Sequence, residues 1–179
     1  VKRPDGFASR EDIDEYVHFA ETVFKRYKNK VKYWITFNEL NSALMGIGTG
    51  ITNVLGEVDP ALWTSDEPIG LNDMKFDQRK IIEGLHNVMI ASAKAVKIGH
   101  EINPDFVIGC MIAYKESYPL TCNPNDVLYN QQQMFEAVDF CSDVMVNGEY
   151  TSRHLAVIKR RGVDPSFITE KDKQILKEG

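Results

Sequence analysis

Hydrophobic residues recur at helical spacing in two long segments of the chain. The first segment runs from about residue 9 to 28, and Ser9 can cap its start; its apolar face consists of Ile13, Tyr16, Val17, Ala20, Val23, Phe24 and Tyr27. The second segment runs from about 77 to 102, and its inner face consists of Ile81, Ile82, Leu85, Val88, Met89, Ala93 and Val96. A period of 3.6 residues predicts amphipathic helices that each bury one face.

Two shorter runs are apolar without that period. Residues 31–37 and 106–112 are rich in β-branched and aromatic side chains and predict buried strands. The order strand, helix, strand predicts a βαβ unit with parallel strands. We expect a third helix to begin after Asn123-Pro124-Asn125 and to run towards Phe140. Residues 144–146 alternate like a strand, but the run is too short for its period to decide.

The first strand run ends in an amide and a carboxylate, Asn38 and Glu39. In α/β proteins, loops that leave the carboxyl ends of parallel strands converge on one face, where sites are built. The glycine-punctuated stretch 40–75 follows, and irregular stretches beyond ~12–15 residues are uncommon unless they are functional or disordered. We therefore expect residues 40–75 to form a wall beside Asn38 and Glu39. An ordinary strand end with a solvated glutamate is the other interpretation of this spacing.

Composition narrows the classes of protein and partner. With 179 residues, of which 43% are hydrophobic and 26% charged, the chain can form one folded core. A formal net charge of −5 argues against a nucleic-acid partner, because phosphate backbones are bound by clustered lysine and arginine. The sequence shows neither a long apolar run nor an apolar leader, so we expect no membrane partner and a cytoplasmic location.

The sequence offers no pattern typical of a metal or cofactor site. The three cysteines lack metal-ligand spacing, and we expect buried free thiols at Cys110, Cys122 and Cys141. His86 and His100 lack the His-Glu-x-x-His pattern, so helix packing or surface placement is expected for them. The glycine-rich stretch 46–50 lacks the lysine of a phosphate-binding loop.

A longer motif resembles a known family. The stretch Tyr33-Trp34-Ile35-Thr36-Phe37-Asn38-Glu39 is similar to family 1 glycoside hydrolases, the family of β-glucosidases and 6-phospho-β-glucosidases. The likeness covers nearly the whole chain and continues through Phe19–Tyr27, His86–Ala93, Asn103-Pro104, Ile108–Met111 and Gly148-Glu149-Tyr150. Within the family, Glu39-Leu40-Asn41 and Tyr118–Pro124 resemble the phospho-glucosidase branch. Thr151 departs from the family pattern, which often has proline there, and it puts no catalytic residue in doubt.

The resemblance implies a fold, an activity and site residues. The fold would be α/β, a partial (β/α)8 TIM barrel made of middle βα units only. Glu39 would be the acid/base of a retaining β-glycosidase that acts on 6-phospho-β-glucosides, and Asn38 would hold the sugar's 2-hydroxyl. Trp63 is a candidate for stacking on a sugar ring, although anchoring its loop is an alternative role. A retaining glycosidase needs two carboxyl groups ~5–5.5 Å apart, and it needs no cofactor.

The second carboxylate is absent from the match. The family carries it as a Glu followed by Asn-Gly, and no such triplet occurs in this chain; Glu116, Glu149 and Glu170 stand in other contexts and are expected to be solvated or loop carboxylates. We therefore expect residues 1–179 to be an incomplete barrel segment, with earlier strands before Val1 and the nucleophile beyond Gly179. Alone, the chain should be inactive and should tend to self-associate. The alternative is a noncatalytic α/β domain that binds a ligand or a partner through Glu39.

Overall fold

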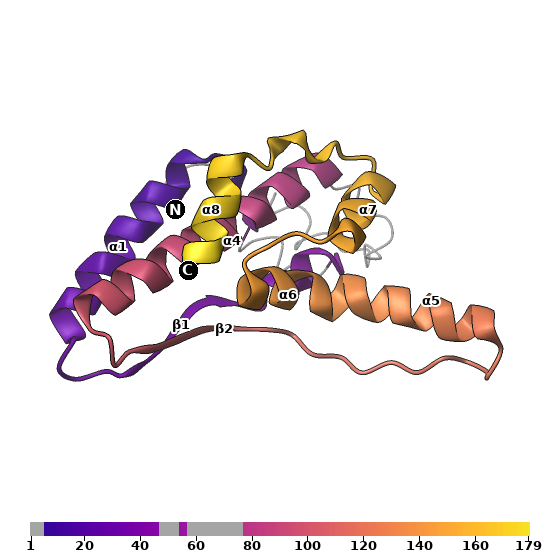
Figure 1. Cartoon of the computed structure of the whole chain (residues 1–179), viewed down its shortest axis with the longest axis horizontal. Helices are drawn as coiled ribbons and strands as arrows, with labels where there is room; N and C mark the ends of the chain where they lie inside the picture. Colours follow the sequence, from indigo (N-terminus) through magenta and orange to yellow (C-terminus); the bar gives the residue numbers. More distant parts are fainter. Residues whose placement is uncertain (1–5, 47–53, 57–76) are drawn as a thin grey trace, which may run out of the picture.

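The computed structural model describes residues 6–46, 54–56 and 77–179, and it shows helices packed on one face of a two-stranded sheet (Figure 1). The main elements are α1 (Glu11–Tyr27), β1 (Tyr33–Asn38), η2 (Leu40–Ala43), α4 (Gln78–Ile102), β2 (Val107–Met111), α5 (Pro124–Met134), η3 (Phe135–Asp139), α6 (Phe140–Asn147), α7 (Ser152–Arg160) and α8 (Glu170–Glu178). Two short 3₁₀ turns, Gly6–Ala8 and Pro165–Phe167, complete the order.

Helix α4 is the centre of the fold, and it confirms the long predicted helix. Its first turn is capped by Asp77, whose side chain accepts hydrogen bonds from the N–H groups of Arg79 and Lys80. More than half of its residues are buried, because it packs between α1 and α8 and against the strands. Helix α1 is also confirmed, but Ser9 does not cap it: the N-cap position is Arg10, which makes no side-chain capping bond.

Strands β1 and β2 pair in parallel, as the βαβ prediction requires. Tyr33 pairs with Val107 and Asn38 with Met111, with an irregularity in register between Ile35 and Asn38. One face of the pair packs on the helices: the half-buried Trp34 meets Phe24 edge-on at 4.9 Å between ring centroids.

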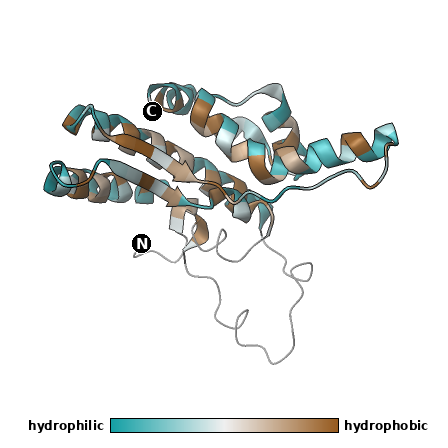
Figure 2. Cartoon of the chain, turned by 90° about the horizontal axis from the view of Figure 1, so that it is seen from below, coloured by the Kyte–Doolittle hydropathy of each residue, from teal (hydrophilic) through white to brown (hydrophobic). Residues whose placement is uncertain are grey.

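The prediction that both strands are buried is wrong for their other face. Tyr33 is 73% exposed, Ile35 66%, Val107 51% and Met111 43%. Figure 2 views the molecule from this side, with the strands in front of the helices. Two strands leave a sheet face that only further strands of a closed barrel would cover, and this is why hydrophobic side chains are exposed here.

The third predicted helix is confirmed and is longer than expected. Helix α5 continues without a break through η3 into α6, and η3 is a π-helical turn. Residues 144–146, whose alternation suggested a strand, belong to α6. Helix α6 ends at Asn147, and its C-cap Gly148 has φ 68°. Gly148 packs so closely on α8 that an added Cβ would lie 2.8 Å from the Leu176 carbonyl oxygen. Glycine tolerates both constraints.

The structure also bears on the cysteines and on membrane-spanning helices. The cysteines are free thiols, but Cys141 alone is buried; Cys110 is half-buried and Cys122 is exposed in the loop before α5. In the described part of the chain, we find no helix with the length and apolarity needed to cross a membrane.

Candidate active site

The Asn-Glu pair lies where the sequence predicted it, at the carboxyl end of a parallel strand. Asn38 is the last residue of β1 and pairs with Met111 on β2. The N–H group of Glu39 donates a 2.7 Å hydrogen bond to the Met111 carbonyl oxygen. The Glu39 backbone is therefore fixed against the ends of both strands. Its side chain is half-buried, and Asn38 is exposed.

Glu39 has an unusual backbone conformation. With φ 50° and ψ 43°, it is the one residue other than glycine with positive φ among those that the structure describes. A left-handed non-glycine residue costs on the order of 1–3 kcal/mol, and such residues concentrate at functional sites. At Glu39 this conformation turns the chain abruptly from β1 into the buried turn η2.

The turn η2 is held by polar side chains that follow Glu39. Ser42 donates hydrogen bonds from its N–H group and its hydroxyl to the Glu39 carbonyl oxygen, at 3.0 and 2.5 Å. Asn41 is fully buried, and its side chain bonds to main-chain groups of Ala113 and Ala137. The sequence reasoning assigned no role to Asn41, although a polar residue between Leu40 and Ala43 in a buried turn is a signal that could have identified it.

The strand before Glu39 is braced from the helix side. The Tyr16 hydroxyl donates a 2.7 Å bond to the Thr36 carbonyl oxygen, and its ring stacks on Phe37 with centroids 4.4 Å apart. Burial raises the pKa of the Tyr16 phenol well above its ordinary value, so this hydroxyl remains a donor throughout the neutral range. The Thr36 hydroxyl shares a 2.8 Å hydrogen bond with that of Ser92 on α4.

The other candidate residues are either outside the described part of the chain or exposed. Trp63 and most of the expected loop wall at 40–75 lie outside the described residues. Glu116, Glu149 and Glu170 are all exposed, which agrees with the solvated or loop roles expected for them.

The histidines pack as expected for helix residues. His86 is buried, with its Nδ1 2.9 Å from the Tyr150 hydroxyl and its Nε2 3.4 Å from an oxygen of Asp172, whereas His100 is exposed. Among the residues that the structure describes, no group of three histidine, cysteine or acidic side chains is placed to hold a metal ion.

Solved structures define the class of fold. Over 97% of its length the chain matches a β-glucosidase from Exiguobacterium marinum, with a TM-score of 0.74, 21% sequence identity and 36% of that chain covered. The chain is thus a part of a (β/α)8 barrel, as predicted. The sequence profile of glycosyl hydrolase family 1 matches residues 2–179, and the chain belongs to this family.

Two curated relatives resemble the chain more closely in sequence. It is 37% identical over 175 residues to a 6-phospho-β-glucosidase of Clostridium longisporum, covering 98% of this chain and 33% of that protein. It is 38% identical over 174 residues to the aryl-phospho-β-D-glucosidase BglA of Bacillus subtilis (strain 168), covering 97% of this chain and 34% of that protein. The chain therefore spans about a third of the length of these relatives.

Proposed function

We propose that the full-length protein containing this chain is a retaining β-glycosidase that hydrolyses 6-phospho-β-glucosides, and that this chain supplies its acid/base, Glu39. The observation that carries the proposal is the position of Glu39, on a strained turn bonded to the ends of two parallel strands. The named activities of the two curated relatives support the substrate class. The family match and the relatives favour this enzyme over a noncatalytic binding domain.

The chemistry requires two carboxyl groups with different roles. One attacks the anomeric carbon, and the bond to the leaving oxygen breaks as Glu39 donates its proton to that oxygen. Glu39 then removes a proton from water, which attacks the glycosyl-enzyme and releases the sugar. The Asn38 amide would bind the 2-hydroxyl, in a hydrogen bond that strengthens in the oxocarbenium-like transition state. Trp63 is a candidate for stacking on the sugar or aglycone, with anchoring of its loop as the alternative role.

The nucleophile would come from a part of the full-length protein outside these 179 residues. No glutamate of the chain is followed by Asn-Gly, the family's nucleophile context. Glu116, Glu149 and Glu170 are also exposed. Residues 1–179 would then be an incomplete barrel segment, without the first strands and the part that carries the nucleophile.

The test compares Glu39→Gln with wild type in the full-length protein. The substitution is isosteric and removes proton donation, which is typically worth ~10²–10⁴-fold in rate. We expect a loss of that size for 6-phospho-β-glucosides with alkyl aglycones, and a smaller loss for nitrophenyl aglycones, which depart without protonation. Glu101→Gln, at an exposed glutamate near the end of α4, before β2 begins, is the control and should leave both rates unchanged. Equal losses for both aglycones would contradict the acid/base role.

The isolated chain should behave differently from the full-length protein. With one of two required carboxyl groups it should not hydrolyse β-glucosides or 6-phospho-β-glucosides, even at high concentration. The exposed strand face supports self-association, which sedimentation velocity would detect as a concentration-dependent increase in mass. Turnover that vanishes with Glu39→Gln would show that the nucleophile lies within these residues. Three free thiols favour a reducing compartment, and we propose a cytoplasmic location on that basis.

A further inference from the structure

We propose that Asn41 is a positioning residue for Glu39, one that fixes the turn carrying the carboxyl group to two distant parts of the fold. This inference rests on the proposed acid/base role of Glu39. Asn41 has no exposed surface, lies two residues after Glu39 and is part of η2. It has no path to a substrate through its own side chain, so its influence would act through the backbone of Glu39.

The Asn41 carboxamide uses both of its donors and its carbonyl oxygen. Its Nδ2 group donates to the carbonyl oxygens of Ala113 at 2.7 Å and Ala137 at 2.6 Å. Its Oδ1 accepts from the N–H group of Ala113 at 2.9 Å. A primary amide has two N–H donors and a carbonyl oxygen that accepts, so in this one orientation both donors and the oxygen have a partner. A buried amide without these partners would be unfavourable, which makes the orientation well determined.

The reciprocal pair with Ala113 continues the sheet where the main chain of β1 leaves it. The last backbone bond between the strands runs from the Glu39 N–H group to the Met111 carbonyl oxygen. Ala113 lies two residues further along, at the position of the next rung of a ladder. The main chain has turned away at Glu39, and the Asn41 side chain makes this rung in its place. The left-handed residue is thereby held between two points of attachment to the same strand segment.

The third bond reaches the π-helical turn between α5 and α6. In a π-helical turn the main chain departs from the regular ladder of bonds between residues four apart, and such turns are frequent at functional sites. Ala137 lies within this turn, and its carbonyl oxygen accepts the second Asn41 donor. The irregularity in the helix thus coincides with the point where Asn41 needs an acceptor.

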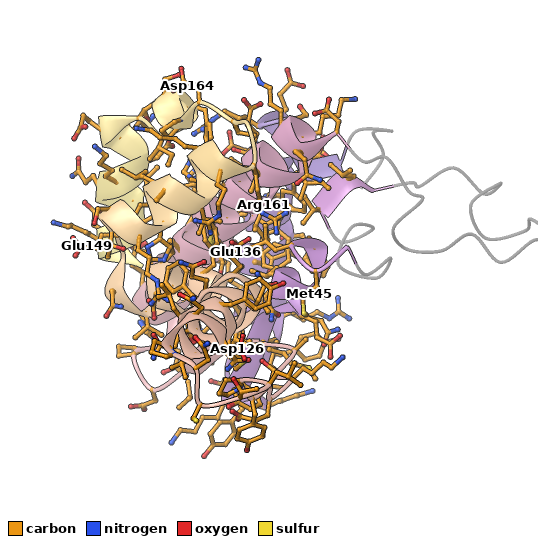
Figure 3. All side chains as sticks on the ribbon, turned by 90° about the vertical axis from the view of Figure 1, so that its right-hand side faces the viewer. Met45, Asp126, Glu136, Glu149, Arg161 and Asp164 are labelled. Atoms are coloured by element: carbon orange, nitrogen blue, oxygen red, sulfur yellow. The ribbon has the colours of Figure 1, made fainter. Side chains whose placement is uncertain are left out.

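A second contact holds the end of η2 to the same turn. Arg161 donates from Nη2 to the Leu44 carbonyl oxygen at 2.9 Å and to Glu136 Oε2 at 3.3 Å. Glu136 precedes Ala137 in the π-helical turn. Figure 3 shows Arg161 beside Glu136, with Met45 near them. The π-helical turn therefore contacts η2 at Asn41 and, through Arg161, at Leu44.

Loss of the Asn41 hydrogen bonds should slow catalysis, because proton donation by Glu39 depends on the position of its carboxyl group. A displacement of ~1 Å at a reacting group can cost on the order of 10²-fold in rate. Without the Asn41 bonds, the turn at Glu39 can relax towards ordinary backbone angles, and the carboxyl group would move relative to the leaving oxygen. Substrates that need protonation should therefore suffer more than substrates that do not.

The test is Asn41→Asp in the full-length protein. This near-isosteric change replaces the two N–H donors by an oxygen that faces two carbonyl oxygens. We expect kcat/KM to fall ~10–100-fold for 6-phospho-β-glucosides with alkyl aglycones and less than ~3-fold for nitrophenyl aglycones. Asn41→Ser, which retains one donor, should show the same preference with a smaller loss. It serves in place of Asn41→Asp if that variant does not fold.

Asn103→Asp is the matched control at the opposite end of the sheet. The Asn103 side chain likewise joins two backbone segments, donating to the Lys28 carbonyl oxygen at 3.2 Å and accepting from the Asp105 N–H group at 3.0 Å. It undergoes the same chemical change far from Glu39, so the ratio of rates for the two aglycones should stay at the wild-type value.

Glu39→Gln, measured in parallel, separates the two proposals. If Glu39→Gln lowers both aglycone rates equally or not at all, the proposed function fails and Asn41 has no acid to position. If Glu39→Gln is selective but the Asn41 variants lower both rates equally, or lower only the melting temperature, the positioning role is overturned and the proposed function stands. Selective losses in the Glu39 and Asn41 variants, with none in Asn103→Asp, support the inference.

Discussion

Two polar side chains, Asn41 and Asp172, are fully buried, and they differ in the groups that supply their hydrogen bonds. Asn41 is neutral and bonds only to main-chain groups around Glu39. Asp172, on α8, accepts hydrogen bonds from the Arg10 side chain and from the N–H and hydroxyl groups of Thr169, and one of its oxygens lies 3.4 Å from His86 Nε2. The first cluster joins η2 to the segment just after β2 and to the π-helical turn between α5 and α6, whereas the second joins α8 to α1 and α4.

The difference lies in how each cluster depends on charge. Burial by itself would raise the pKa of the Asp172 carboxyl, but the polar contacts with His86, Arg10 and Thr169 together hold this pKa well below its usual range. The Asp172 cluster therefore stabilises the fold in a way that depends on pH. The Asn41 cluster has no titrating group, and its hydrogen bonds are directional, so its expected effect is on the placement of Glu39. Substitutions in the two clusters should therefore separate effects on the stability of the fold from effects on the placement of Glu39.

The largest effect on stability is expected for Asp172→Asn. Asp172 is fully buried, but the Arg10 side chain is 49% exposed and is solvated when the carboxylate is removed. The loss is therefore that of hydrogen bonds to a charged group, typically ~1.5–3 kcal/mol. We expect the free energy of unfolding of the full-length protein, measured in urea, to fall by about this amount. The ratio of rates for alkyl and nitrophenyl aglycones should not change. Asp14→Asn is the control: Asp14 is 81% exposed in its pair with Lys94, and an exposed pair is worth ~0–1 kcal/mol. A change in the ratio for Asp172→Asn would remove the contrast between the clusters.

The second prediction concerns pH. Because the folded pKa of Asp172 is lower than the unfolded value of ~3.9, its contribution to stability is complete above that pH and is lost as the pH falls towards the folded pKa. The difference in unfolding free energy between wild type and Asp172→Asn should therefore narrow by about 1 kcal/mol from about pH 5 to about pH 3. Asn41→Ser should show no such narrowing relative to wild type. A difference for Asp172→Asn that stays constant with pH would argue against an ionised Asp172.

The hydrogen bond between Tyr150 and His86, beside Asp172, should contribute less to stability than the bonds to Asp172. The Tyr150 hydroxyl lies 2.9 Å from His86 Nδ1, and Tyr150→Phe removes it without changing the ring. A typical net loss is ~0.5–1.5 kcal/mol, measurable as a lower urea midpoint. Tyr114→Phe, at an exposed hydroxyl bonded to Glu116, provides the control and should be nearly neutral. A loss at Tyr150 as large as that for Asp172→Asn would show that the cluster acts as one unit.

The smallest expected effect tests the backbone at Glu39. In a left-handed conformation alanine is penalised by roughly 1–2 kcal/mol, whereas glycine is not, and this exceeds the ~0.4–1 kcal/mol that alanine gains from its less flexible unfolded chain. Glu39→Gly should therefore be more stable than Glu39→Ala by up to about 1 kcal/mol. In a regular helix or strand the order would be reversed. Thermal unfolding of the two variants, both without the carboxyl group, measures this difference. Equal stability would mean that Glu39 does not hold this conformation in solution.

Much of the fold and part of the site could be predicted from local patterns. The 3.6-residue period located α1 and α4, and the β-branched run ending in Asn38 and Glu39 located β1 and the end that carries the chemistry. These predictions succeed because each depends on side chains near one another in sequence. The resemblance to family 1 glycoside hydrolases added the role proposed for Glu39, which periodicity alone left open.

The tertiary structure decided what depends on distant partners. Asn41 bonds to residues 72 and 96 positions away, and no local pattern encodes such a pairing or the π-helical turn that receives it. The exposed strand face depends on which other strands are present, and residues 144–146 became helical because α5 continues into α6. Local sequence patterns thus specified the long helices, the first strand and the candidate acid. Long-range hydrogen bonds and packing determined the backbone conformation in which that acid is held.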